Sequence, residues 1–167
     1  MMSKLRVFDF DDTLVKTESV VYVHTADNQI INLLPGEFAT YVAKPGDRFD
    51  FSDFDLVKQP RAKRHDVVFK KCLAKGDSDV VILTARANGA RDALRAYLSQ
   101  KYKTTSAVQI ITLGSSDPYD KALWIRDAIS KNGYNDLYFC DDSWENCRAV
   151  GDVCNKLNLR KMKIQKL

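Results

Sequence analysis

The segment Val7-Phe8-Asp9-Phe10-Asp11-Asp12-Thr13-Leu14 decides the fold prediction, because an apolar strand runs directly into three acidic residues. Residues 5–9 (LRVFD) predict a buried strand. A strand end with this much negative charge is unfavourable unless a cation binds nearby. Asp9 and Asp11 lie two residues apart, so both can approach one centre, by side chain or by backbone. Such oxygen ligands suit Mg²⁺, and the plainer alternative is an acidic turn after a strand.

Further apolar runs along the chain predict more strands, with amphipathic helical stretches between them. The predicted strands are 79–83 (DVVIL), 108–113 (VQIITL), 137–140 (LYFC) and, more weakly, 161–164 (KMKI). The predicted helices are 61–75, 91–102, one that begins at Asp117-Pro118 and ends at Gly133, and one from about 144 to 157 with Ser143 as its cap. This alternation predicts an α/β fold with a Rossmann-like, doubly wound parallel sheet, in a single domain over 1–167.

One segment, at about 15–59, departs from this alternation. It contains VVYVHTADNQIINLL (20–34), two β-rich runs around an Ala-Asp-Asn turn, which predicts a hairpin. The remainder is rich in turn residues and aromatics. We therefore expect a flap or lid inserted after the first strand, rather than a second domain.

Composition narrows the class of protein. The chain has 167 residues, a net charge of +4 and 45% hydrophobic residues, which suits one globular domain. It has no apolar run of the roughly 18 residues that would span a membrane, and its N-terminus lacks the pattern of a secretory signal. We expect a cytoplasmic protein whose four cysteines are free thiols.

The other predicted strands also end in polar side chains that suit phosphate chemistry. Thr84 and Arg86 follow the second strand, where a hydroxyl, free backbone N–H groups and a guanidinium could cradle a phosphate. Lys121 opens the helix after the third strand, and Asp141 and Asp142 follow the fourth. Alone, the threonine could be a helix cap and the lysine a surface charge. Together they are expected to meet, because ligands of such sheets bind at the carboxyl ends of the strands.

The order of these motifs resembles the haloacid dehalogenase (HAD) superfamily of phosphohydrolases, over residues 4–14 and 60–165. Within it, the chain resembles compact end-healing phosphatases of phages and bacteria. The four motifs are matched by Asp9, Asp11 and Thr13, by Thr84, by Lys121, and by Asp141 with Asp142.

The resemblance implies a role for each catalytic residue. Asp9 would attack phosphorus and form an aspartyl-phosphate. Asp11 would protonate the leaving oxygen and then activate water. Thr84 would bind the transferring phosphoryl group, and Lys121 would hold the nucleophile and the phosphate.

The resemblance also implies a magnesium site. Mg²⁺ would bind Asp9, Asp142 and the backbone carbonyl of Asp11, with Asp141 in support. Thr13 and Arg86 are the further residues expected to contact the phosphate.

Two details refine the resemblance. Many members carry an acid four residues after the metal-binding aspartate, but here Asn146 stands there and Glu145 precedes it. Either could support the metal ligands.

An acid at position 11 equips the site to protonate an oxygen leaving group. The dehalogenases lack this acid, so dehalogenation is not expected.

The expected function is Mg²⁺-dependent hydrolysis of a phosphomonoester. A flap in place of a large cap would leave the site open, and a basic stretch favours nucleic-acid ends or nucleotides as substrates. Alternatives are a phosphatase of a small metabolite and a phosphate-binding module without turnover. No membrane partner is expected, and the sequence carries no signal for the oligomeric state. The basic residues are Lys58, Arg61, Lys63, Arg64, Lys70, Lys71 and Lys75.

Overall fold

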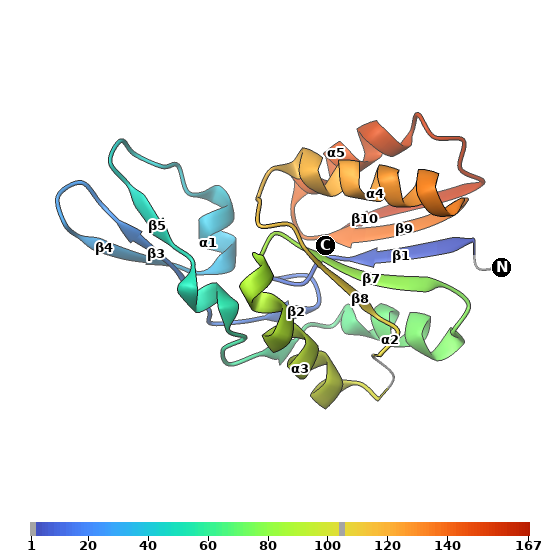
Figure 1. Ribbon diagram of the computed structural model, residues 1–167, viewed down its shortest axis with the longest axis horizontal. Coiled ribbons are helices and arrows are strands. Elements are labelled where there is room, and N and C mark those ends of the chain that lie inside the picture. Colours follow the sequence, from blue (N-terminus) through green and yellow to red (C-terminus); the bar gives the residue numbers. More distant parts are fainter. Residues whose placement is uncertain (1–2, 104–105) are drawn as a thin grey trace.

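The computed structural model describes residues 3–103 and 106–167 and has an α/β architecture (Figure 1). Within these residues the central sheet has five strands, all parallel, in the order β10-β9-β1-β7-β8. This is the arrangement of a doubly wound sheet, with the first strand in the middle. The prediction of an α/β fold with a parallel sheet is confirmed, and the order is compatible with a Rossmann-like fold. The strands are β1 (Lys4–Phe8), β7 (Asp79–Thr84), β8 (Gln109–Thr112), β9 (Asp136–Asp141) and β10 (Lys161–Lys166).

Helices cover both faces of this sheet (Figure 1). Helices α2 (Asp66–Lys75) and α3 (Arg91–Lys101) pack on one face, and α4 (Pro118–Asn132) and α5 (Trp144–Cys154) on the other. The predicted terminal signals of α4 are confirmed: the side chain of Asp117 caps its start, and Gly133 ends it in the left-handed conformation. In the described part of the chain, no helix is both long and apolar enough to cross a membrane.

The helix predicted at 61–75 begins later than expected. Arg61–Ala62 forms a short strand, β6, which pairs with β2 (Val15–Lys16) at the base of the insert. Helix α2 starts at Asp66. A basic run carries no local signal that separates a helical turn from an exposed strand, and here the pairing with β2 decides between them.

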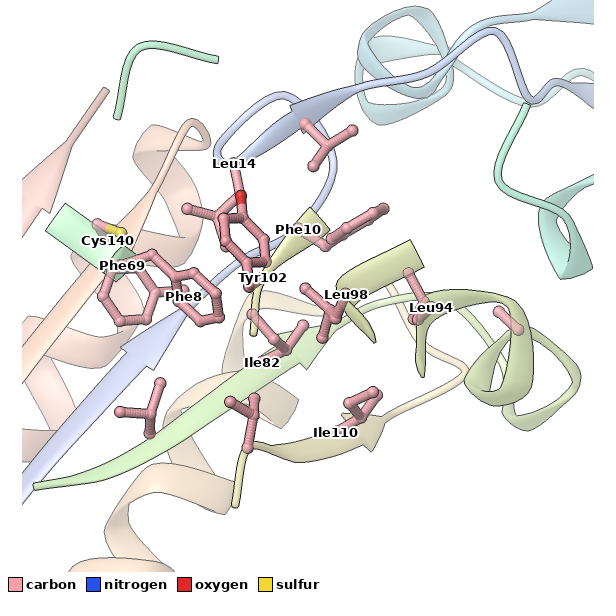
Figure 2. Packing of buried hydrophobic residues seen from close by; sticks show 14 of the residues in the cluster. Phe8, Phe10, Leu14, Phe69, Ile82, Leu94, Leu98, Tyr102, Ile110 and Cys140 are labelled. Atoms are coloured by element: carbon pink, nitrogen blue, oxygen red, sulfur yellow. The ribbon is translucent and has the colours of Figure 1, made fainter. Parts of the chain in front are cut away.

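The hydrophobic core has two layers, one on each side of the sheet. Phe8 and Ile82 point from the sheet into one layer, where they meet Phe69 of α2 and Leu94 of α3 (Figure 2). The opposite layer contains Ile125 of α4 with other buried residues of α4 and α5. Cys140, Cys147 and Cys154 are buried in these layers as free thiols, as expected for small apolar side chains.

The insert forms a small structure of its own beyond the carboxyl ends of the parallel strands (Figure 1). The predicted hairpin is confirmed as β3 (Val21–His24) and β4 (Ile30–Leu33). A third antiparallel strand, β5 (Arg48–Asp50), pairs with β3. The insert also holds α1 (Pro35–Thr40) and the 3₁₀ turn η1 (Ser52–Asp55), which faces a second such turn, η2 (Asn88–Ala90). We call residues 15–59 the flap.

Candidate active site

The sheet brings the predicted strand-end residues to one place. Strand β1 lies between β7 and β9, so Asp9 follows the central strand with Thr84 and Asp141 at the ends of its two neighbours. The backbone amide of Asp9 donates to the carbonyl of Cys140 at 3.1 Å, which extends the ladder one residue past β1. Parallel pairing alone therefore gathers chemically active side chains that lie more than 130 residues apart in the chain.

Lys121 joins this cluster from the first turn of α4. Its Nζ donates to Asp9 Oδ1 and to Asp141 Oδ2, both at 2.8 Å. All three side chains are almost fully buried. A buried ammonium with two carboxylate partners is held firmly, and removing it would leave two buried carboxylates without compensation. The lysine is thus part of the site and not a surface charge.

Thr13 connects Asp9 with Asp142. The Thr13 hydroxyl lies 2.8 Å from Asp9 Oδ2 and 3.2 Å from Asp142 Oδ1, and it accepts a hydrogen bond from the Asp142 amide. Thr13 is fully buried, so it orients these two carboxylates rather than facing the cavity as a phosphate ligand.

The carboxylates of Asp9, Asp141 and Asp142 form a group able to hold a cation. One oxygen from each lies within 4.8 Å of the others. Hard oxygen donors at this spacing fit Mg²⁺, which takes one or two carboxylates together with water and phosphate oxygens. Asp141 is already engaged, since its oxygens accept bonds from Lys121, Asn146 and the Ser143 amide. Asp9 and Asp142 are the better candidates for direct ligands.

Electrostatics support the same interpretation. Burial and the Asp141 carboxylate raise the pKa of Asp9 well above its ordinary value, in spite of Lys121. Burial also raises the pKa of Asp142. Burial alone would lower the pKa of Lys121, but Asp9 and Asp141 outweigh it and the pKa is raised. One ammonium thus pairs with two of the three carboxylates, and a further cation would relieve the excess negative charge.

A tight turn follows Asp11, the second acid of the first motif. Asp12 has a φ of 60°, a left-handed conformation that aspartate tolerates, and its amide donates to the Val15 carbonyl. The amides of Thr13 and Leu14 both donate to the Phe10 carbonyl. The chain leaves this turn at Val15, where the flap begins.

Asp11 is held by Arg86 across the mouth of the site. Arg86 Nε donates to Asp11 Oδ2 at 2.8 Å and Nη2 donates to Oδ1 at 2.7 Å. Nη1 donates to the backbone carbonyls of Phe54 and Leu56 in the flap. The Arg86 side chain is 1% exposed. Its guanidinium therefore binds protein acceptors here while Arg86 also lines the cavity, and Asp11 lies outside the carboxylate group around Asp9.

Asn146, and not Glu145, contacts the acidic cluster. Asn146 Nδ2 donates to Asp141 Oδ2 at 3.0 Å, whereas the Glu145 carboxylate accepts from the Ser143 hydroxyl at the start of α5. Of the two alternatives left open by the sequence, the geometry favours Asn146 as the supporting residue.

A cavity of about 720 Å³ opens over this cluster. Asp9, Asp142, Thr84 and Lys121 lie on its floor, contributed by the sheet edge and α4. The flap contributes the opposite wall, and a Cβ atom on Gly36 would lie only 3.4 Å from Asp12 Oδ2, so the flap closely approaches the site. The aromatic lining residues of the flap are Phe38, Tyr41, Phe49, Phe51 and Phe54.

The aromatic wall was not predicted residue by residue. The sequence showed only that the flap is rich in aromatics, and nothing local told which of them face the site. In the basic stretch that favoured nucleic acid, Lys58 pairs with Asp53 and Lys70 with Asp66. Lys63 Nζ donates to the backbone carbonyl of Asp12, which lies at the cavity. Among the cavity-lining residues that the structure describes, none comes from the basic stretch 58–75.

Comparison of the chain with protein-family models, with curated proteins and with solved structures finds no match.

Proposed function

We propose that this protein is a Mg²⁺-dependent phosphomonoesterase that works through an aspartyl-phosphate on Asp9, as its resemblance to the HAD superfamily implies. The observation that carries the proposal is the surroundings of Asp9 on the cavity floor. Its carboxylate contacts Lys121 at 2.8 Å and lies within 4.8 Å of carboxylate oxygens from Asp141 and Asp142. A nucleophile, a fixed ammonium and candidate metal ligands in one cavity are the requirements of phosphoryl transfer.

The chain's own residues would divide the reaction into two steps. In the first, an Asp9 oxygen attacks phosphorus, the bond from phosphorus to the ester oxygen breaks, and Asp11 gives that oxygen a proton. In the second, Asp11 takes a proton from water, the water oxygen attacks phosphorus, and inorganic phosphate leaves Asp9 free again. Lys121 and the Thr84 hydroxyl would orient the phosphoryl group and offset its charge.

A bound Mg²⁺ would supply charge neutralisation and alignment of the phosphate. Asp9, Asp142 and the backbone carbonyl of Asp11 are the groups proposed to hold it, while Asp141 would position Lys121 and Asn146. The donor set fits, since oxygens of Asp9, Asp141 and Asp142 lie within 4.8 Å of one another and Lys121 pairs with the first two of these three carboxylates.

Asp11 must change its contacts to act as the acid. Both of its oxygens accept hydrogen bonds from Arg86, so neither is free to reach a leaving oxygen. We propose that the Asp11 side chain rotates away from Arg86 when substrate enters, and that the described arrangement is the resting one.

Phosphate release from an aryl phosphate tests the proposal. The wild-type protein should be active with Mg²⁺ and inactive in excess chelator. Asp9→Asn should abolish turnover, because a neutral amide cannot form the covalent intermediate. Asp127→Asn, the same change on the exposed surface of α4, is the matched control and should be fully active. Wild-type activity in Asp9→Asn, or full activity in chelator, would contradict the proposal.

A further inference from the structure

The cavity has two chemically different parts, and only one of them is used by the chemistry proposed above. The floor is polar and acidic, while the flap wall is aromatic. A phosphate group alone is far smaller than 720 Å³, a volume within the range of sites that enclose whole small ligands. The flap wall is therefore available to the part of the substrate that carries the phosphate.

The flap aromatics form a connected surface, not a closed core. Phe38 meets Phe51 edge to face, with ring centroids 5.5 Å apart, and it contacts Phe49 and Phe54 in the same way. Phe49 and Phe51 are nearly parallel, with an interplanar angle of 23°. Phe51 is still 44% exposed, and α1 has no fully buried residue. The rings leave flat apolar surface open to the cavity, which suits a planar aromatic ligand.

The charges around the cavity limit the ligand to one phosphate. The two cations among the described lining residues, Arg86 and Lys121, already have carboxylate partners. Apart from the carboxylates around Asp9, the lining carries more acids than cations, so a second phosphate would meet repulsion and no unpaired cation. The acidic lining residues are Asp9, Asp11, Asp12, Asp55, Asp141, Asp142 and Glu145.

We infer that the substrate is a nucleoside monophosphate, whose base stacks on the flap phenylalanines, chiefly Phe51, while its single phosphate lies at Asp9. The inference rests on the proposed phosphomonoesterase function and names its substrate class. A nucleobase supplies the planar ring, the ribose spans from wall to floor, and one phosphate matches the one site that a cation can neutralise. The aromatic wall provides the selectivity between nucleotides and sugar phosphates.

Adenosine 5′-monophosphate and ribose 5-phosphate form the first test pair. Both present a phosphate on the same primary alcohol, so a difference in kcat/KM reports the base and not the leaving group. We expect the nucleotide to be favoured roughly 5- to 100-fold, the range that corresponds to stacking of one base on an aromatic side chain. Hexyl phosphate should be as poor as the sugar phosphate, since it is apolar but not planar.

Substitutions of Phe51 are the second test. Phe51→Ala and Phe51→Leu should both reduce the ratio of kcat/KM for the nucleotide to kcat/KM for ribose 5-phosphate, whereas Phe51→Tyr should keep this ratio. Phe51→Leu retains an apolar side chain, so it separates ring stacking from hydrophobic burial. Val42→Ala, at a flap residue that is 80% exposed and does not line the cavity, is the control.

A binding measurement gives a readout independent of turnover. Calorimetry with Asp9→Asn and Mg²⁺ should show tighter binding of adenosine 5′-monophosphate than of ribose 5-phosphate or of adenosine 3′,5′-bisphosphate. Equal kcat/KM for nucleotide and sugar phosphate, equal efficiency of hexyl phosphate, or tighter binding of the bisphosphate would overturn the inference, the last in favour of nucleic-acid ends. Those results leave the phosphatase proposal intact, because that proposal is tested separately, by hydrolysis of the aryl phosphate, by chelator and by Asp9→Asn.

Discussion

Arg86 holds Asp11 through two parallel hydrogen bonds, of 2.8 Å from Nε and 2.7 Å from Nη2, while its Nη1 binds two backbone carbonyls of the flap. The same guanidinium lies 4.9 Å from the ring centroid of Phe54. One buried cation thus connects the proposed acid to the base of the flap.

Removing this cation should be costly. Arg86→Ala leaves the Asp11 carboxylate and the carbonyls of Phe54 and Leu56 without their donor, and we expect the free energy of unfolding to fall by about 3 kcal/mol. Arg86→Lys should recover only part of the loss, because an ammonium cannot reproduce the planar fork. Urea unfolding of both variants measures these changes.

A double-mutant cycle with Asp11→Ala isolates the pair. Contacting residues in one network couple by roughly 0.5–3 kcal/mol, so the double variant should lose less stability than the sum of the single variants. Strict additivity would mean that Arg86 and Asp11 do not interact in solution.

Asp11→Asn should separate the proposed acid from the nucleophile. General acid catalysis contributes roughly 10²- to 10⁴-fold, so an alkyl phosphate should be slowed by about that factor. An aryl phosphate should be slowed less in the first chemical step, because its leaving oxygen needs little protonation. Single-turnover kinetics with both substrates measure this step. Equal slowing of the two would show that Asp11 does not protonate the leaving group.

The effect of Mg²⁺ on stability should depend on pH. The pKa of Asp9 is raised by burial and by Asp141, so the folded, metal-free protein retains a proton above the ordinary carboxyl pKa of 3.8. The free energy of unfolding from this group therefore falls as pH rises through the folded-state pKa. Lys121, with its pKa raised from 10.5, stays charged between pH 5.5 and 8 and adds no slope there.

Since Mg²⁺ competes with that proton, it should raise the Tm more at pH 8 than at pH 5.5. Thermal unfolding in Mg²⁺ and in chelator at both values gives the comparison. The Asp142→Asn variant should lose most of the Mg²⁺ effect. A larger stabilisation at the lower pH would contradict the assignment of these carboxylates as metal ligands.

Asn146 and Glu145 should differ in their influence on metal binding. Asn146→Ala removes a donor to Asp141, which itself supports the proposed ligands, so we expect metal affinity to fall by about 10-fold, the lower end of the range for residues that contact a ligand directly. Glu145→Gln, one residue away and exposed, should leave the affinity near that of the wild type. The Mg²⁺ concentration for half-maximal activity is the measurement. The reverse order of effects would assign the supporting role to Glu145.

Local sequence was enough to predict much of the fold. Some features affect only the structure of their immediate neighbours, so their effects can be predicted locally. They are the apolar run before Asp9, the capping residue Asp117 and the terminating Gly133. The arrangement of strand ends followed from a general rule for parallel sheets. The start of α2 was wrong by five residues, because Arg61 pairs with Lys16, a distant partner that no local pattern reveals.

The sequence by itself determined which residue types stand at the ends of the strands, and hence the chemistry that we propose for this protein. Tertiary structure decided how those residues are used. Arg86 and Asp11 are 75 positions apart, and only the packing of the flap against η2 and the sheet edge directs the guanidinium to the acid instead of a phosphate. The position of Phe51 at the cavity also depends on how the flap folds back. Such contacts arise from the balance of packing and charge over the whole chain, which short-range patterns do not encode.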